Sequence, residues 1–291
     1  MPAAAAGECS PVCARPSGSA DPLVPATPPG FLDLGGLLVG AHAGDAFVLA
    51  GEEGRHAAKV ARIGVGEQLL LTDAEGRQVL CRVTEARKEQ LELELLEDPT
   101  PPRDRRPHLA LVQALATGGR DEQAVESATE LGADRITPWI ADRSVSVWRG
   151  EKLRKGRAKW EATARAAVKQ CRRPGIPAVD APLGSRDLAE EVAARRADGG
   201  IVLVLHEQES VALLSLAGEL RAAAAASPPA PEITVIVGPE GGISEHELDD
   251  LRRAGARSVL LGPEVLRSST AGPAALAVLS TLVGRWDGGN P

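Results

Sequence analysis

The residues with the clearest chemical potential lie in a glycine-rich segment, 238–242, which directly follows the apolar run 233–237. Glycine lets backbone N–H and C=O groups approach a ligand without an intervening side chain. The segment matches neither the phosphate-binding pattern GxxxxGK[ST] nor the dinucleotide pattern GxGxxG. It carries Glu240 and no lysine, which disfavours phosphate groups. These features favour an adenosine-type ligand with a cationic centre; the alternative is a tight strand-to-helix turn that needs glycine for its dihedral angles.

Two further loops are expected beside this segment. LHEQES begins at the end of the apolar run 201–205, and LGPEVLRSSTAG begins at residue 261. Open parallel sheets bind ligands beyond the carboxyl ends of their strands, where such loops diverge. Ser244 and Glu247 have the spacing of a capping box, which predicts that a helix begins at this point.

The elements that must position these loops alternate between strand and helix. Strands are predicted at 108–115, 135–141, 178–180, 201–207, 233–238 and 256–262. Helices are predicted at 121–133, 151–170, 187–197, 211–226, 244–255 and 273–286. Gly132 is interpreted as the stop of the first of these helices, with Leu131 packed beside it. Strands and helices that alternate in this way predict an α/β fold with a parallel sheet covered on both faces.

The first third of the chain has a different pattern, with short strand-like runs in place of alternating strands and helices. Strand-like runs lie at 45–50, 67–73, 77–86 and 90–97, and a short alanine-rich helix is predicted at 54–64. Ala74-Glu75-Gly76 reads as the turn of a hairpin. We therefore expect three parts: a disordered Pro/Ala/Ser/Gly-rich tail over 1–29, a small β-barrel over 30–100, and the α/β domain over 101–291.

Composition restricts the classes of function. Aromatic residues make up 2% of the chain and there is no tyrosine, which counts against an aromatic platform for stacking bases. A net charge of −7 counts against a generally polybasic protein but not against a local basic patch. The four cysteines form no CxxC pair, so a zinc site is not expected. The chain shows neither a secretory signal nor an apolar run of membrane-spanning length, and we expect it to be cytoplasmic.

Several segments together resemble the ribosomal RNA small-subunit methyltransferase E family. They are GPEGGISEHEL (238–248), LLGPEVLRSSTAGPAAL (260–276), ESATELGADRITPWIADRSV (126–145), KWEATARAAVKQCRRPGIP (159–177) and the barrel segment RHAAKVARIGVGEQLLLTDAEG (55–76). The resemblance extends over about residues 31–286. It implies a 16S rRNA uridine-N3 methyltransferase of the SPOUT superfamily. The expected architecture is a PUA-like β-barrel followed by an α/β trefoil-knot domain that binds S-adenosylmethionine without a metal, in a homodimer.

The resemblance also implies which residues bind the cofactor. They are Leu205, His206, Glu207, Gly238, Glu240, Gly241, Gly242, Leu261, Gly262, Val265, Leu266, Arg267 and Thr270. The sequence departs from the family pattern L-R-T-E-T-A at Ser269, which replaces the family's glutamate. A carboxylate at that position is therefore not essential if the chain is active, and Arg267 and Thr270 remain the stronger candidates in this loop.

Transfer of a methyl group to N3 of uracil requires alignment and removal of the N3 proton. Arg267 is the candidate for stabilising the developing negative charge; a phosphate contact or an interface salt bridge is the alternative. Glu207, Glu240 and His206 are candidate bases, and the sequence does not rank them. Two other functions stay open: ribose 2′-O methylation of tRNA or rRNA, and rRNA binding by an assembly factor without turnover.

Basic residues are concentrated between 143 and 173, a segment that contains eleven basic and two acidic residues. Such a segment is most often a solvated helix face, but the resemblance favours contact with rRNA phosphates. The candidates for RNA binding are His56, Lys59, Arg62, Arg143, Arg165, Lys169, Arg172 and Arg173, with Arg103, Arg105 and Arg106 of the linker adding reach. His56 has a structural capping role as its alternative.

Overall fold

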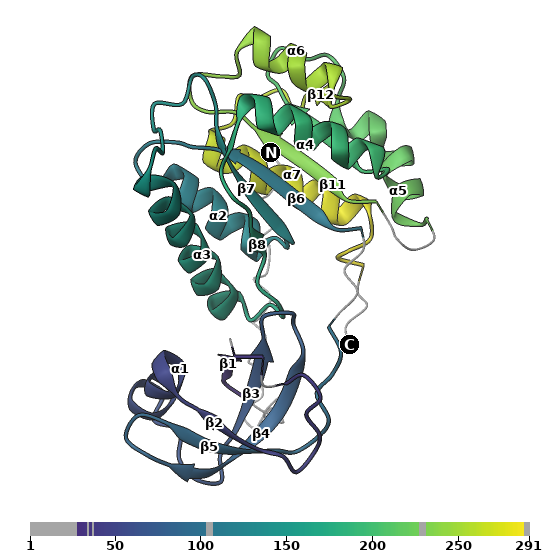
Figure 1. Ribbon diagram of the computed structural model, residues 1–291. Coiled ribbons are helices and arrows are strands. Elements are labelled where there is room, and N and C mark those ends of the chain that lie inside the picture. The colour runs from purple at the N-terminus through teal and green to yellow at the C-terminus, as the bar shows by residue number, and fades with distance from the viewer. Residues whose placement is uncertain (1–27, 34, 37, 103–106, 227–230, 288–291) are drawn as a thin grey trace, which may run out of the picture.

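The computed structural model describes residues 28–33, 35–36, 38–102, 107–226 and 231–287. Two sheets are present, one at each end of the molecule in Figure 1, and each has its own apolar core. The disordered tail expected over 1–29 and the three linker arginines fall outside the described residues, apart from 28 and 29.

The N-terminal sheet has five strands in the order β1-β3-β4-β5-β2. They are β1 (Gly30–Asp33), β2 (Ala46–Leu49), β3 (Gln68–Asp73), β4 (Gln78–Ala86) and β5 (Leu91–Leu95). In β5 the leucines are buried and the glutamates half-buried, so the period-two pattern places one face on the core. The predicted hairpin joins β3 to β4, and Gly76 at φ +97° occupies its turn. The predicted helix begins earlier than expected, as α1 (Gly51–Arg55), and continues as a π-helical turn at His56–Val60.

The C-terminal sheet has seven strands, and every described pairing in it is parallel. The strands are β6 (Leu109–Ala114), β7 (Arg135–Ile140), β8 (Ala178–Val179), β9 (Leu183–Gly184), β10 (Ile201–Leu205), β11 (Ile233–Val237) and β12 (Arg257–Val259). Their order is β12-β10-β11-β6-β7-β8, with the short β9 also paired to β7. This order brings β11 to the centre, between β10 and β6, so the glycine-rich loop emerges from the middle of the sheet.

Helices cover both faces of this sheet. They are α2 (Arg120–Glu130), α3 (Glu151–Cys171), α4 (Ser185–Ala197), α5 (Ala217–Ala224), α6 (Glu245–Arg253) and α7 (Ser268–Leu282). One apolar core joins the sheet to α2, α3, α5 and α7, and a second joins it to α4 and α6. The architecture is the one expected from the sequence: a small β-sheet unit is followed by an α/β unit whose parallel sheet is covered on both faces.

Two helix starts differ from the prediction. The helix expected over 211–226 begins as a 3-10 turn at Leu213–Leu216 before α5. The last helix begins at Ser268 rather than at Pro273, which lies inside α7. Proline has no N–H to donate and is tolerated in the first turn of a helix, so the sequence indicates a helix start at Pro273. In the structure this residue lies in the second turn of α7. Gly272, just before it, packs so closely that an added Cβ would lie 2.8 Å from Cδ1 of Leu111 on β6.

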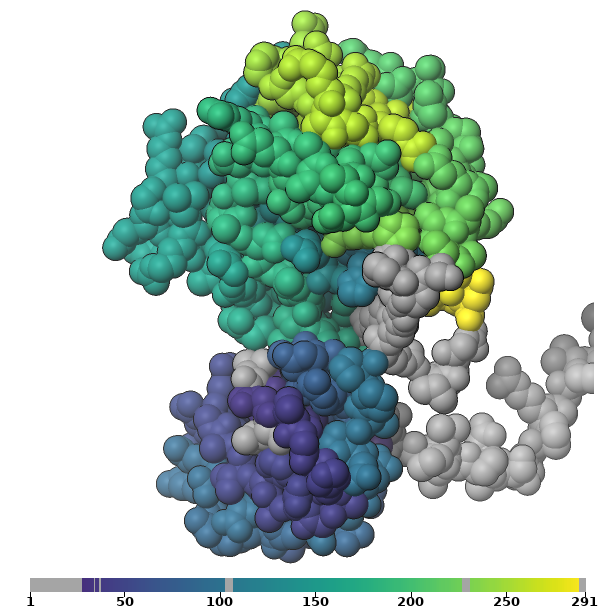
Figure 2. All heavy atoms as spheres, turned by 45° about the vertical axis from the view of Figure 1, so that its right-hand side comes forward, coloured from purple at the N-terminus to yellow at the C-terminus, as the bar shows by residue number. Residues whose placement is uncertain are grey.

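The two units touch where α3 ends. The backbone N–H of Ile176 donates to the carbonyl of Ala74 in the β3–β4 turn, at 3.0 Å. Lys169, near the end of α3, forms an ion pair with Glu53 of α1. Figure 1 shows α3 running down to the barrel, and Figure 2 shows the two units joined over a small part of their surfaces. The helix thus connects the α/β unit to the barrel.

Candidate functional site

A cavity of about 780 Å³ lies at the carboxyl ends of β10, β11 and β12. Every residue predicted to bind the cofactor lines it except Thr270, which is exposed on α7 away from the lining. The cavity also contains residues that the sequence reasoning missed, among them Arg120, Ile243, Arg252, Leu260 and Ser268. Arg120 follows β6, and only the strand order places β6 next to β11. The three loops are therefore brought together as expected, and a fourth loop joins them.

The glycines of the loop after β11 are required by close packing. A Cβ added to Gly238 would lie 2.6 Å from Cγ1 of Ile243, and one added to Gly241 would lie 3.0 Å from the carbonyl oxygen of Arg143. Gly242 has φ +74°, a conformation that side chains with a Cβ rarely adopt. The tight-turn alternative considered from the sequence thus describes the backbone of this loop, and the same loop forms a wall of the cavity.

Glu240 ties the glycine loop to the turn before α2. One carboxylate oxygen accepts hydrogen bonds from the N–H of Thr117 at 3.1 Å, its hydroxyl at 3.3 Å and the Arg120 guanidinium at 3.4 Å. Partial burial raises the pKa of the Glu240 carboxyl, but these hydrogen bonds and the nearby charge outweigh it, so the net pKa is lowered. A carboxylate held in this way is a weak base, and its geometry is that of a loop tether.

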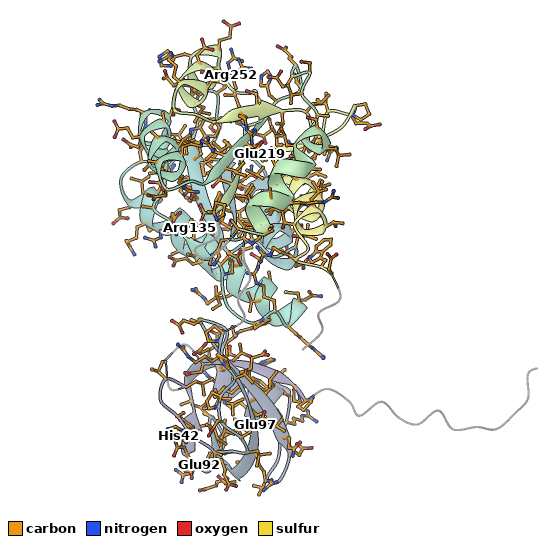
Figure 3. The ribbon with its side chains drawn as sticks, turned by 90° about the vertical axis from the view of Figure 1, so that its right-hand side faces the viewer. His42, Glu92, Glu97, Arg135, Glu219 and Arg252 are labelled. Carbon is orange, nitrogen blue, oxygen red and sulfur yellow. The ribbon has the colours of Figure 1, made fainter. Side chains whose placement is uncertain are left out.

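Arg267 differs from Arg252, the other arginine that lines the cavity from the C-terminal part of the chain. Its backbone carbonyl accepts from Thr270 and Ala271 at the start of α7, and its exposed side chain makes no ion pair with any described residue. Arg252, by contrast, is held by Glu209 and Ser258, both at 2.9 Å. Figure 3 places Arg252 at the end of the molecule remote from the barrel. The guanidinium of Arg267 is therefore the one of this pair that is open to a ligand.

The two remaining candidate bases lie on the loop after β10. His206 is half-buried, and its Nδ1 accepts from the N–H of Gln208 at 3.3 Å, which leaves Nε2 as the other ring nitrogen. Glu207 is exposed and lines the cavity. Both side chains keep an atom that could meet a ligand, whereas one of the two carboxylate oxygens of Glu240 is occupied by its three donors.

The cavity fits an adenosyl group by its size and its lining. Its volume lies within the usual range for small-molecule sites, about 300–1,000 Å³. Apolar side chains on its rim remain exposed to solvent, Val265 by 74% and Leu266 by 39%. Backbone groups of the glycine loop provide polar contacts beside them. Ser269, where the family has glutamate, is buried in the first turn of α7 and does not line the cavity.

The basic candidates for RNA binding occupy several different environments. The side chain of Arg173 is 9% exposed, and its guanidinium donates to the carbonyl of Thr129 at 2.7 Å and pairs with Asp134, so it is engaged within the fold. Lys169 pairs with Glu53, and Lys59 pairs with Glu89.

Other members of that set are freer. His56 packs edge-on against Phe31 with ring centroids 5.8 Å apart. Arg62 and Arg172 are exposed, Arg165 is half-buried, and none of the three forms an ion pair with a described residue. Arg143 lies at the cavity itself rather than on α3. The predicted basic surface is thus smaller than the sequence indicates.

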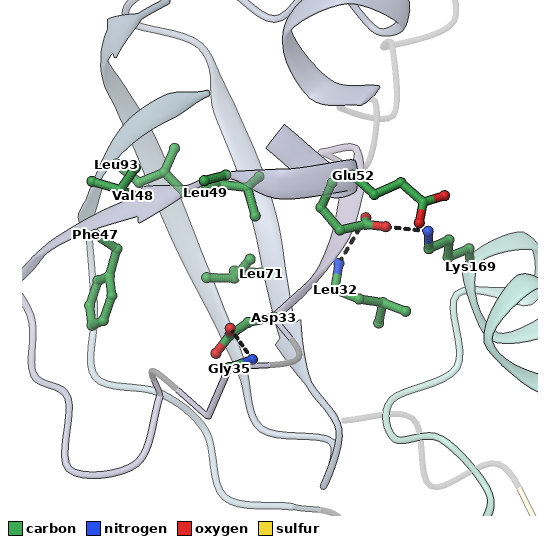
Figure 4. Close-up of a pocket in the computed structure, with 12 residues that line it drawn as sticks. Leu32, Asp33, Gly35, Phe47, Val48, Leu49, Glu52, Leu71, Leu93 and Lys169 are labelled. Atoms are coloured by element: carbon green, nitrogen blue, oxygen red, sulfur yellow. Dashed lines mark hydrogen bonds and ion pairs between the residues drawn. The ribbon is translucent and has the colours of Figure 1, made fainter. Parts of the chain in front are cut away.

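A second cavity, of about 360 Å³, lies in the barrel between β1, β2 and α1 (Figure 4). Leu32, Leu71 and Leu93 give it an apolar floor. Lys169 reaches it from α3, and Asp33 accepts a hydrogen bond from the N–H of Gly35 at 2.8 Å. Apart from Lys169, no residue predicted to bind cofactor or RNA lines this cavity.

The described residues lack two kinds of feature. They contain no group of three or more His, Cys, Asp or Glu side chains placed to hold a metal ion. No helix among them is long and apolar enough to cross a bilayer.

Comparison with known proteins defines the class first. Residues 103–280 match the family described as an RNA methyltransferase domain, and residues 49–96 match the RNA methyltransferase PUA domain. The class is therefore that of RNA methyltransferases with a PUA domain. These matches confirm the fold class expected from the sequence, a PUA-like barrel followed by a SPOUT-type α/β domain. More narrowly, relatives that are 43% identical over 82% of the chain show that it belongs to the ribosomal RNA small subunit methyltransferase E family.

Individual relatives support this membership. The chain is 43% identical to ribosomal RNA small subunit methyltransferase E of Mycobacterium tuberculosis over 82% of its own length and 88% of that protein. It is 28% identical to the Bacillus subtilis protein of the same name, over 80% of the chain and 89% of the relative. The structure of the Neisseria gonorrhoeae protein of that name, bound to S-adenosyl methionine, is similar with a TM-score of 0.73 and 26% identity, covering 88% of this chain and 98% of that one.

Proposed function

We propose that this chain transfers a methyl group from S-adenosylmethionine to N3 of a uridine in 16S rRNA of the small ribosomal subunit. The observation that carries the proposal is the cavity at the carboxyl edge of the sheet, in a chain that belongs to this family. A relative of known structure was solved with S-adenosyl methionine bound. The cofactor, when bound, supplies an electrophilic methyl group on a positively charged sulfur.

The chain's own residues would perform three tasks at this cavity. Backbone groups of 238–242 and the apolar side chains of Leu205 and Leu261 would hold the adenosyl group. The Arg267 guanidinium would stabilise the negative charge that develops on the uracil as N3 loses its proton. Glu207 and His206 are the candidates for taking that proton, because the tethered Glu240 is already engaged with three donors.

The RNA would lie along α3. This helix begins at Glu151, close in the chain to Arg143 at the cavity, and ends beside the barrel (Figure 1). Arg165 and Arg172 on this path are without ion pairs to described residues and are available to phosphates. Arg62 and His56 would extend the contact onto the barrel, whereas Arg173 is removed from the set by its buried bonds.

Three further parts of the proposal concern organisation. We place the domain boundary near residue 100, with 30–100 as the RNA-binding barrel and 101–291 as the methyltransferase domain. The protein would act in the cytoplasm. It would act there as a homodimer, because a second copy would cover apolar side chains such as Val265 that are exposed at the cavity rim. Light scattering of the purified protein tests the dimer, and a monomer at micromolar concentration would contradict it.

The deciding experiment combines purified protein, labelled S-adenosylmethionine and small subunits from a strain that lacks this modification. Label at N3 of one uridine is expected. Label on a ribose 2′-oxygen would support the ribose-methyltransferase alternative, and cofactor binding without transfer would support the assembly-factor alternative. Arg267→Ala should lower kcat about 10²-fold or more if the charge-stabilising role holds. Arg186→Ala is the control, because that side chain is exposed on α4.

A further inference from the structure

Glu247 is a buried carboxylate that lies behind the glycine loop rather than in the cavity. Its exposed fraction is 1%, and it sits in the first turn of α6. One oxygen accepts from the backbone N–H of Asp142 at 2.8 Å and from the hydroxyl of Ser185 at 2.6 Å. The other accepts from the N–H of Ser244 at 2.9 Å and from its hydroxyl at 2.8 Å. The residue therefore joins α4, α6 and the segment after β7.

The four hydrogen bonds use the full accepting capacity of the carboxylate. Burial raises the pKa of the Glu247 carboxyl, but the four donors outweigh burial and the net pKa is lowered. The capping-box role that the sequence predicts accounts only for the bonds with Ser244. The bonds from Asp142 and Ser185 have no part in capping α6, and they connect segments 105 and 62 residues away in the chain.

The bond to Asp142 fixes the residue that follows it, Arg143. The backbone of Arg143 packs on Gly241, where an added Cβ would lie 3.0 Å from its carbonyl oxygen and 3.1 Å from its Cβ. Its guanidinium lies beside Gly242 and lines the cavity, with no ion pair to any described residue. The buried carboxylate of Glu247 thus holds Arg143, a cation at the rim of the cavity, in place through the backbone N–H of Asp142.

We propose that Glu247 is a positioning residue: it holds residues 142 and 143 against the glycine loop so that Arg143 meets a phosphate of the RNA next to the target nucleotide. The inference rests on the proposed function for the identity of the RNA. It separates Arg143 from the basic residues of α3, because Arg143 acts at the cavity where the chemistry takes place. It also gives a role to a buried carboxylate that adjoins the cavity without lining it.

The test measures binding of unmodified 16S rRNA without cofactor, as a function of salt concentration, for Glu247→Gln, Arg143→Ala and the double variant. Glutamine has nearly the same shape but turns an amide N–H₂ toward two of the four donors. Each single variant should weaken binding about tenfold and reduce the slope of log affinity against log salt by about 0.7 to 0.9, one phosphate contact. The double variant should bind like Arg143→Ala alone, because both changes remove the same contact.

Asp180→Asn is the matched control, since Asp180 accepts from the hydroxyl of Thr137 at 2.6 Å in a network away from the cavity. It should lower the thermal midpoint and leave the salt slope unchanged. Ser185→Ala, which removes one donor to Glu247, should shift binding in the same direction by about two- to threefold if Glu247→Gln does not fold. An unchanged salt slope in Glu247→Gln, or effects that multiply in the double variant, overturns the proposal. RNA binding with these changes but no methyl transfer by the wild type overturns the proposed function instead.

Discussion

The two edges of the parallel sheet are built from different kinds of residue. At the amino edge, Asp134 pairs with Arg173 and Arg285, and Arg195 pairs with Glu232, so half-buried charges face partners of opposite sign. At the carboxyl edge, glycine and exposed apolar side chains surround the cavity. Arg120 and Arg252 pair there with Glu240 and Glu209, but Arg143 and Arg267 form no ion pair with any described residue. Figure 3 shows Arg135 of the first edge nearer the barrel and Arg252 of the second edge farther from it. The charges named at the amino edge are all paired, whereas two of the four arginines that line the cavity at the carboxyl edge form no ion pair with a described residue.

The largest effect is expected at the amino edge. Asp134→Ala would leave the guanidinium groups of Arg173 and Arg285 buried without their carboxylate, at exposed fractions of 9% and 7%. Removal of one partner from such a cluster costs about 3–5 kcal/mol. Urea denaturation should show this loss, while cofactor affinity at a temperature where the variant is folded should stay within about twofold of wild type. A stable Asp134→Ala with weakened cofactor binding would reverse the assignment of the two edges.

The cavity edge should respond in the opposite way. Gly241→Ala would push a Cβ against the backbone of Arg143, which Glu247 and its donors hold in place. We expect the cofactor Kd to rise about tenfold or more, with a loss of stability of about 1–3 kcal/mol from overpacking. Calorimetric titration measures the affinity. Gly218→Ala is the control, because a Cβ there meets no atom within 4 Å; affinity equal to wild type in Gly241→Ala would contradict the role of this wall.

A buried carboxyl that forms no ion pair with any described residue lies near the cavity edge, in the first turn of α2. Burial, and then the neighbouring Glu122, raise the pKa of Asp121 to about 6. Because the folded-state pKa exceeds the ordinary value of 3.8, the unfolded chain releases this proton first, and stability falls as pH rises from about 4 to 6. Asp121→Asn should therefore raise the free energy of unfolding at pH 7.5 by roughly 1–3 kcal/mol. The gain should vanish at pH 4; a gain that is the same at both pH values would refute the cause.

The smallest effect is expected at Glu240. Its lowered pKa and its three donors identify it as a tether for the loop, so Glu240→Gln should weaken cofactor binding by only a few-fold, or about 1 kcal/mol. The dependence of kcat on pH between 6 and 8 should be the same as in wild type. Loss of turnover with an altered pH profile would instead make Glu240 the base. Glu245→Gln, at another exposed residue that lines the cavity, serves as the comparison.

Much of the fold could be predicted because its local signals are strong. The runs 201–205 and 233–237 are continuously apolar and became fully paired strands of the parallel sheet. The capping box at Ser244 and the hairpin turn at Gly76 also formed where their residues predict them. The starts of helices were less predictable. Pro273 is a local signal for a helix start, but α7 begins at Ser268, and the close packing of Gly272 on Leu111 of β6 is a tertiary contact that the sequence does not show.

The strand–helix alternation, the family resemblance and three of the loops that line the cavity could be read from the sequence, because each depends on residues close together in the chain. The fourth loop, with Arg120, could not, because the strand order places it there. Tertiary structure alone decided which charges are free. Arg173 and Arg143 belong to the same basic segment, and the sequence does not distinguish them. In the structure Arg173 packs against Asp134 with its side chain 9% exposed, whereas Arg143 lines the cavity. The partner of a charge lies tens of residues away, and its distance and burial set whether that charge holds the fold together or remains available to a ligand.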